Sequence, residues 1–222
     1  MRDGKIDRSP MQGFSLLPTP RGRLRFLTEG EEQRLKETMT PKHFRLVRFA
    51  ILTGLRREEQ FSLTWSDIDL PNHVLTIPRS KHGGTRHAPL SDEAIEILKA
   101  IRAETRVMSA WCFPSQNPTT NLDPQNFYRR VYLPALETVV IKDLTWHGLR
   151  HTCASRLVMA GVDIRTVQEF LGHKTLAMTM RYSHLSEAHL TQAVNRISKG
   201  KFPDGTDTKT DKRESDVQEE VV

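Results

Sequence analysis

The sequence predicts an α+β domain that is mostly α-helical and carries one small antiparallel β-sheet. Helix start and stop signals recur along most of the chain, with capping residues or proline at the starts and glycine at several ends. Between residues 65 and 90 the pattern changes to short strand-like segments separated by turn residues. With 222 residues, the chain is long enough to bury one core of good size.

The first helices are predicted by their start signals. Thr28 followed by Glu31 forms a capping box at the first start. Pro41 stands at the first position of a second helix, where its missing N–H does no harm. That helix ends at Gly54, a residue able to adopt a left-handed helix cap. A short third helix is expected over residues 56–63.

Three segments have the composition of short strands. They cover residues 65–69, 73–77 and 85–88, with turn residues at 71–72 and 83–84. This spacing predicts a small antiparallel sheet. After it, Ser91 caps a helix whose apolar side carries Ile95, Ile97, Leu98 and Ile101. A further helix is expected to start at Asp123 and Pro124 and to run towards Val140.

The C-terminal half is predicted to be helical from Trp146 onward. Glycines mark the helix ends, Gly161 and Gly172. Capping residues mark the new starts, Asp163, Thr175 and Ser186. Three regions follow from these patterns: an extended linker over residues 1–25, a folded domain over 26–199, and a disordered charged tail over 200–222.

The positive charge is unevenly distributed along the chain. The formal net charge is +6, and residues 201–222 hold four lysines and arginines against seven aspartates and glutamates, which leaves +9 on the first 200 residues. A basic body favours a polyanionic partner, although charge does not identify it. No apolar run approaches the roughly 20 residues that span a bilayer. Two cysteines, Cys112 and Cys153, are too few for a disulfide framework, so buried thiols in a reduced cytoplasmic setting are expected.

One phenol and a series of cationic and imidazole side chains are the candidates for chemistry. Tyr182 can act as a nucleophile. The side chains suited to binding a phosphate are Arg56, Lys81, His147, Arg150 and His173. A guanidinium can donate to two phosphate oxygens at once. Because His147 and Arg150 are three apart on a predicted helix, they share one face.

Several other kinds of site find no support in the sequence. It contains no serine hydrolase elbow, no glycine-rich phosphate loop and no carboxylate cluster for a metal. His147 and His151 are four apart, as in some zinc sites, but no acidic residue lies between them. His151 is therefore expected to be a packing or hydrogen-bonding residue. Three methionines, Met159, Met178 and Met180, are expected to fill the core.

Four segments resemble the sequence boxes of the tyrosine recombinase (phage integrase) family. They are residues 53–65 with Arg56 and Glu59, 80–86 with Lys81, 145–152 with His147 and Arg150, and 170–174 with His173, nine residues before Tyr182. Gly148 departs from the pattern, since aspartate is frequent there in the family. The resemblance covers roughly residues 24–198 and implies the tyrosine recombinase catalytic-domain fold over 26–199.

The resemblance also implies a reaction. Tyr182 would attack a DNA phosphodiester, form a 3′-phosphotyrosyl bond and free a 5′ hydroxyl. The phosphate would be held by Arg56, Arg150 and His173, with His147 as base or as a hydrogen-bond partner of the phosphate. Lys81 would protonate the leaving oxygen and Glu59 would support the site. No metal and no cofactor take part in this scheme.

Partners and setting follow from the same resemblance. Double-stranded DNA is the expected substrate, bound by a homo-tetramer on paired sites that is a monomer in isolation, with accessory DNA-bending proteins as further partners. A prokaryotic cytoplasm without membrane attachment is expected. Residues 1–25 resemble the linker that follows a DNA-binding domain in this family, which indicates a piece of a longer integrase.

Three other interpretations stay open at the level of sequence. A type IB topoisomerase uses the same tyrosine chemistry without joining two DNA partners. A non-catalytic regulator would use residues 157–171 as a helix-turn-helix, which leaves Arg56, Lys81 and Tyr182 unexplained. A metal-dependent nuclease would use the histidines as ligands.

Overall fold

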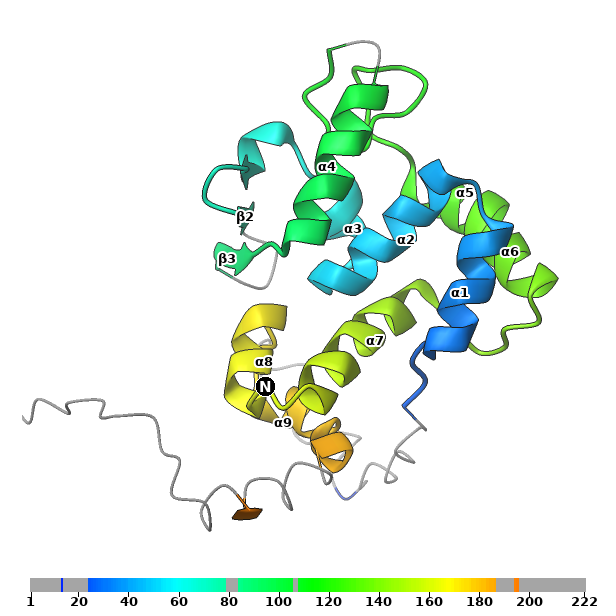
Figure 1. Ribbon diagram of the computed structural model, residues 1–222. Helices are drawn as coiled ribbons and strands as arrows, with labels where there is room; N and C mark the ends of the chain where they lie inside the picture. Colours follow the sequence, from blue (N-terminus) through cyan, green and yellow to red (C-terminus); the bar gives the residue numbers. More distant parts are fainter. Residues whose placement is uncertain (1–12, 14–23, 79–83, 106–107, 187–193, 196–222) are drawn as a thin grey trace, which may run out of the picture.

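The computed structural model describes most of the predicted domain (Figure 1). The described residues are 13, 24–78, 84–105, 108–186 and 194–195. Most of the predicted linker, the whole predicted charged tail and Lys81 lie outside them. Helices make up most of the described chain, and three short strands form one antiparallel sheet. The predicted class, mostly α with a small sheet, is confirmed.

The first three helices begin where their start signals predict. They are α1 (Glu29–Thr38), α2 (Pro41–Thr53) and α3 (Arg57–Phe61). Thr28 and Glu31 form the capping box, and Gly54 ends α2 at a φ of 60°. Helix α3 is shorter than the predicted 56–63, because Arg56 occupies its N-cap position with an extended backbone. This turn projects the Arg56 side chain from the junction of α2 and α3.

The sheet has the order β1-β2-β3 and antiparallel pairing. Its strands are β1 (Ile68–Asp69), β2 (Val74–Ile77) and β3 (Arg86–Pro89). The predicted strand over 65–69 is wrong for its first part, which is a 3-10 turn, η1 (Trp65–Asp67). The Asp67 carboxylate accepts from the backbone N–H of Thr64 at 2.8 Å and so caps that turn. Figure 1 shows the strands at the edge of the helical body, on the side away from α1.

The chain after the sheet is helical, with one irregular stretch. Helix α4 (Asp92–Glu104) starts after Ser91 and buries the four predicted apolar residues. The predicted single helix from 124 towards 140 is instead three pieces, α5 (Pro124–Phe127), the π-helical turn η2 (Tyr128–Tyr132) and α6 (Leu133–Thr138). Pro134 has no N–H to donate to the carbonyl one turn earlier, which favours a wider turn ahead of it.

The last described helices carry most of the predicted site residues. They are α7 (Trp146–Met159), α8 (Ile164–Leu171), α9 (Leu176–Met180) and the 3-10 turn η3 (Ser183–Ser186). As predicted, Asp163 caps α8 and Gly172 ends it, with a φ of 65°. The helix expected after Ser186 falls outside the described residues, apart from helical residues 194–195.

Helix α7 lies at the centre of the packing. It packs on α2 on one side and on α8 and η3 on the other (Figure 1). A large apolar cluster fills the space around α2, α4 and the start of α7, and a second one joins the end of α7 to α8. The ring of Tyr182 belongs to this second cluster. Both cysteines are buried free thiols, as predicted.

The prediction that Met159, Met178 and Met180 fill the core is wrong. These side chains are 41%, 44% and 49% exposed, respectively. In α9 it is Thr179 that is fully buried. Residues adjacent in a helix point in different directions, so the methionines on either side of Thr179 face outward. No helix among the described residues is long and apolar enough to cross a membrane.

Candidate active site

The described members of the predicted set gather where α7 meets the ends of α2 and α8. Arg56 stands at the start of α3, His147 and Arg150 lie on α7, His173 follows the glycine cap of α8, and Tyr182 follows α9. The ring of His173 is parallel to that of Tyr182 at 6.5 Å, and Arg150 donates to the carbonyl of Gly54, two residues before Arg56. Burial, together with the charges of Arg150, Arg56, His147 and Arg181, lowers the pKa of His173 to about 4. Lys81 is the one predicted residue outside the described part of the chain.

Arg150 is the buried centre of this cluster, with only 2% of the residue exposed. Its Nη1 donates to the carbonyl of Gly54 and its Nη2 to the carbonyl of Leu171, both at 2.6 Å. These carbonyls belong to the C-terminal ends of α2 and α8, where no further helical N–H can satisfy them. Burial, followed by the charge of Arg56, lowers the pKa of Arg150 to about 10, so the guanidinium stays charged at neutral pH. Arg150 therefore fastens two helix ends beside the site.

Glu59 organises a second group of cations. Its Oε1 accepts from Nη1 of Arg56 at 2.6 Å, and its two oxygens accept from the two Nη atoms of Arg86 at 3.2 and 3.0 Å. The Arg56 side chain remains 41% exposed while it is held this way, whereas that of Glu59 is 9% exposed. The predicted supporting position of Glu59 beside Arg56 is thus present. No local sequence pattern indicates that Arg86, 27 residues away, completes the group.

Arg86 also explains a local requirement for glycine. A Cβ atom at Gly172 would lie 2.6 Å from Cδ of Arg86, closer than carbon atoms approach each other. Gly172 has a φ of 65° as well, which disfavours other residues. The Arg86 side chain therefore lies directly against the turn that leads to His173. It connects the sheet, the Glu59 group and that turn.

Glu59 should make the unfolding free energy of the protein depend on pH in the acid range. Burial alone would raise the pKa of Glu59, but hydrogen bonds from Arg86 and from the Arg56 backbone, together with the charge of Arg86, hold it at about 2. Because the folded-state pKa is depressed, this stability is present above the unfolded pKa of about 4.3 and is lost as the pH falls towards 2. We expect Glu59 to account for on the order of 3 kcal/mol of unfolding free energy across this window. Urea unfolding at several pH values between 2 and 5 measures this change in unfolding free energy.

A matched variant isolates that effect. Glu59→Gln removes the titrating group, so the slope of unfolding free energy against pH between 4.5 and 2 should become shallower. Glu58→Gln is the control, because the Glu58 side chain is 71% exposed and pairs only with its neighbour Arg57 in the described structure. An unchanged slope in Glu59→Gln would show that the carboxylate is not held in its charged form.

Tyr182 lies inside the domain rather than on its surface. Only 1% of the residue is exposed, and its ring is parallel to that of His173, with a centroid distance of 6.5 Å. Its hydroxyl lies 2.5 Å from Nδ1 of His151. Burial raises the pKa of Tyr182, and the nearby cations Arg181 and Arg150 act in the opposite direction. The phenol is therefore protonated at neutral pH.

The three histidines of the cluster have different surroundings. His147 is exposed, and its ring meets that of His151 edge to face at a centroid distance of 4.7 Å. His173 is half-buried, with Nδ1 at 2.9 Å from the hydroxyl of Thr179. Across the described residues, no group of three or more His, Cys, Asp or Glu side chains could hold a metal ion. The predicted hydrogen-bonding role of His151 is confirmed, and its partner is the Tyr182 hydroxyl.

Arg181 is a member of the site that the sequence analysis did not select. Its side chain is exposed, and its guanidinium carbon lies 6.0 Å from the centre of the Tyr182 ring. Its charge contributes to lowering the pKa of each of the three histidines. Adjacency to the tyrosine was the one signal that could have identified it. The site thus contains an exposed cation beside the tyrosine as well as the partly exposed Arg56.

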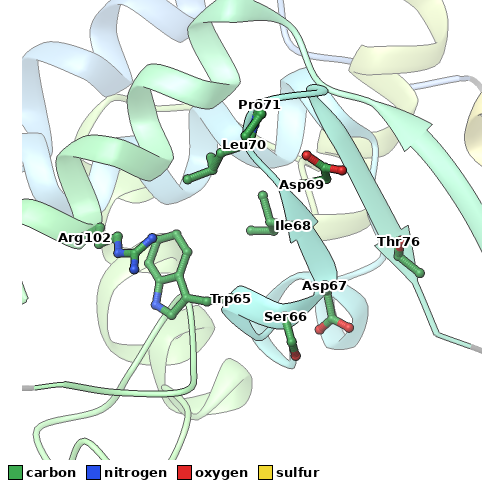
Figure 2. A pocket seen from close by; sticks show the side chains of 9 residues that line it. All are labelled: Trp65, Ser66, Asp67, Ile68, Asp69, Leu70, Pro71, Thr76 and Arg102. Carbon is green, nitrogen blue, oxygen red and sulfur yellow. The ribbon is translucent and has the colours of Figure 1, made fainter.

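A separate hollow lies beside the first strand and does not contain the cluster (Figure 2). It is lined by residues 65–71 together with Thr76 and Arg102. Figure 2 shows the Arg102 guanidinium directed at the Trp65 ring, with 5.1 Å between its central carbon and the ring centre. None of the residues that line it belongs to the predicted set.

Comparison with known proteins gives the same assignment from both sequence and fold. Residues 25–189 match the phage integrase family. The integrase of Salmonella phage P22 is 32% identical over 204 residues, which cover 86% of this chain and 51% of that protein. The catalytic domain of bacteriophage HP1 integrase is 30% identical, with a TM-score of 0.58, over 81% of this chain and 99% of that domain.

A third relative supports the fold alone. The Tn1549 transposon integrase, solved in complex with transposon right end DNA, aligns with a TM-score of 0.71 at 20% identity, over 89% of this chain and 74% of that one. The chain spans about half to two thirds of the length of the curated relatives it matches. From the matched segment, the identity to the phage integrases and the shared catalytic-domain fold, we conclude that the chain belongs to the phage integrase, or tyrosine recombinase, family.

Proposed function

We propose that the chain is the catalytic part of a site-specific recombinase that cuts and rejoins DNA through a covalent bond to Tyr182. One observation carries the proposal: a buried tyrosine hydroxyl lies 2.5 Å from one histidine of a cluster that contains three histidines and the arginines Arg56, Arg150 and Arg181. A phosphodiester is the substrate that such a set fits. It carries one negative charge, accepts hydrogen bonds from several directions, and can be attacked by an oxygen nucleophile.

In this proposal Arg56, Arg150 and His173 stabilise the pentacovalent phosphate. Fixed cationic donors act most strongly where negative charge develops in a water-poor site. Arg150 suits this role because its contacts with Gly54 and Leu171 hold its guanidinium in place before substrate arrives. Arg56 is held by Glu59 yet remains partly exposed, so it can still meet an incoming phosphate oxygen.

The remaining roles rest on the family resemblance and on exposure. His147 is exposed beside Arg150 and would donate to a phosphate oxygen. Lys81 would protonate the leaving 5′ oxygen, a step for which general acid help contributes roughly 10²- to 10⁴-fold. Because these cations supply the charge that a metal ion supplies in many nucleases, we propose that the reaction is independent of metal and cofactor.

Double-stranded DNA is the proposed substrate, and the basic body of the chain supports it. Relatives have been solved with DNA, among them the Tn1549 transposon integrase and XerH bound to its palindromic difH substrate. We propose that this chain is a monomer alone and a homo-tetramer on paired sites, assisted by accessory DNA-bending proteins. The two buried thiols and the bacterial and phage relatives support a prokaryotic cytoplasm as its location.

A trapping experiment tests the proposal. The protein is incubated in EDTA with a nicked suicide substrate, whose short cleaved strand diffuses away and prevents rejoining. We expect a protein–DNA adduct that survives a denaturing gel, and mass spectrometry of the digested adduct should place the link on Tyr182. No adduct under any condition, or an adduct that requires magnesium, would contradict the proposal.

A pair of assays then separates recombination from relaxation. A recombinase should exchange strands between two DNA partners that carry its sites, whereas a type IB topoisomerase needs only supercoiled plasmid. We expect strand exchange between paired sites. Efficient relaxation of plasmids without such sites, and no exchange, would favour the topoisomerase.

A further inference from the structure

The proton of the Tyr182 hydroxyl must leave when the oxygen bonds to phosphorus. The phenol is buried and protonated at rest, and solvent reaches only 1% of the residue. An acceptor must therefore be in place within the site. Nδ1 of His151 lies 2.5 Å from this oxygen, whereas the described contacts of His173 with Tyr182 are between parallel rings 6.5 Å apart.

The surroundings of His151 keep its imidazole neutral and thus able to accept a proton. On its own helix lie His147 and Arg150, and across from it lie His173, Arg181 and Tyr182 itself. Burial first, then the charges of these neighbours, lower the pKa of His151 to about 4. At neutral pH the imidazole is therefore uncharged, and in the tautomer with its proton on Nε2 the Nδ1 lone pair accepts the hydrogen bond from the phenol.

The position of His151 is fixed by the architecture of the site. It follows Arg150 on α7, and Arg150 is fastened to the ends of α2 and α8. His151 is half-buried, between the ring of His147 and the ring of Tyr182, whose centroids lie at 4.7 and 5.9 Å. His147 differs, because it is exposed and can meet a phosphate that approaches from solvent. Of the two histidines, only His151 has a described contact with the Tyr182 hydroxyl.

We propose that His151 is the catalytic base of the cleavage step, which accepts the Tyr182 proton as the phenolic oxygen attacks. The inference rests on the proposed function. The oxygen of Tyr182 bonds to phosphorus, the bond between phosphorus and the 5′ oxygen breaks, and the phenolic proton moves to Nδ1 of His151. The leaving 5′ oxygen takes a separate proton from the general acid, in our proposal Lys81. The negative phosphate offsets the cations around His151, which favours its protonated form at this stage.

Two substitutions at this position separate proton transfer from positioning. His151→Asn keeps an oxygen acceptor near the place of Nδ1 but cannot take up a proton, and His151→Ala removes both properties. The control is His73→Asn, the same chemical change at an exposed sheet turn whose φ of 54° asparagine tolerates. Thermal unfolding of each variant verifies that it is folded at the assay temperature.

Single-turnover cleavage of the suicide substrate is the measurement. We expect both His151 variants to cleave about 10²-fold more slowly than the wild type, within the range for a lost general base, and His73→Asn to match the wild type. Between pH 7 and 9 the wild-type rate should be nearly flat. The His151→Asn rate should rise about tenfold per pH unit, because the phenol must then ionise before it attacks.

A substrate with sulfur in place of the bridging 5′ oxygen adds a chemical test. Thiolate leaves without a proton, so this substrate should restore cleavage to a variant that lacks the general acid and leave the His151 defect in place. A wild-type rate and a flat pH profile in His151→Asn would overturn the proposal, as would a defect in His151→Ala that asparagine repairs. If the wild-type protein forms no adduct at all, the proposed function itself fails, which is a separate outcome.

Discussion

Replacing Tyr182 with phenylalanine is expected to abolish covalent attachment to DNA and to leave the fold intact. The ring belongs to the apolar cluster between α7 and α8, and phenylalanine preserves this packing. The change removes only the hydroxyl and its hydrogen bond to His151, a loss of about 1 kcal/mol in unfolding free energy. The nucleophilic oxygen is lost completely, so cleavage of the suicide substrate should fall below detection.

A denaturing gel and a thermal unfolding curve measure the two effects side by side. Tyr128→Phe is the matched control, since Tyr128 lies half-buried in the π-helical turn, beside Tyr132 and outside the cluster. We expect this variant to form the adduct at the wild-type rate. An adduct that persists in Tyr182→Phe would show that another residue is the nucleophile.

Arg150→Lys is expected to have the second-largest effect, because it alters stability and chemistry together. Lysine keeps the charge, but its single ammonium lacks the planar fork that reaches the Gly54 and Leu171 carbonyls at once. Loss of one charged hydrogen bond in a buried place should lower the unfolding free energy by about 2 kcal/mol. Poorer alignment of the phosphate should slow cleavage by about 10²- to 10³-fold, as for other preorganised charge-stabilising donors.

The control for this experiment is Arg165→Lys on the exposed face of α8. Arg165 forms a surface pair with Glu169, and both side chains are about two thirds exposed. Exposed ion pairs contribute little to the unfolding free energy, so it should change by less than about 0.5 kcal/mol in Arg165→Lys. The cleavage rate should be unaffected. If Arg150→Lys has the same unfolding free energy as the wild type, the two backbone contacts do not hold the helix ends together as inferred. Normal cleavage would contradict the proposed role at the phosphate.

Much of the local structure could be predicted because its causes are local. The capping box at Thr28, the proline that starts α2 and the glycines that end α2 and α8 act over a few residues, and each operates as predicted. Predictions failed where a single residue inside a predicted element favours a different local conformation. The Asp67 carboxylate turned a predicted strand into a 3-10 turn, and Pro134 stands just after the π-helical turn in a predicted continuous helix.

The methionines of α9 show a different kind of limit. Apolar composition predicted burial, yet a helix of five residues has one side against its neighbours, and Thr179 occupies that side. Composition alone does not say which side of a short helix will face the core. That choice depends on how α9 packs on α8, which is a property of the assembled domain.

The sequence by itself determined the family, the fold class and the identity of the candidate residues, since the order and spacing of the boxes are properties of the chain. Tertiary structure alone decided how these residues are held. The hydroxyl of Tyr182 meets a histidine 31 positions away, Glu59 meets Arg86 across 27, and Arg150 reaches a carbonyl 96 positions away. Such pairs depend on the relative placement of whole helices and strands, which packing of the core sets and local sequence patterns do not encode.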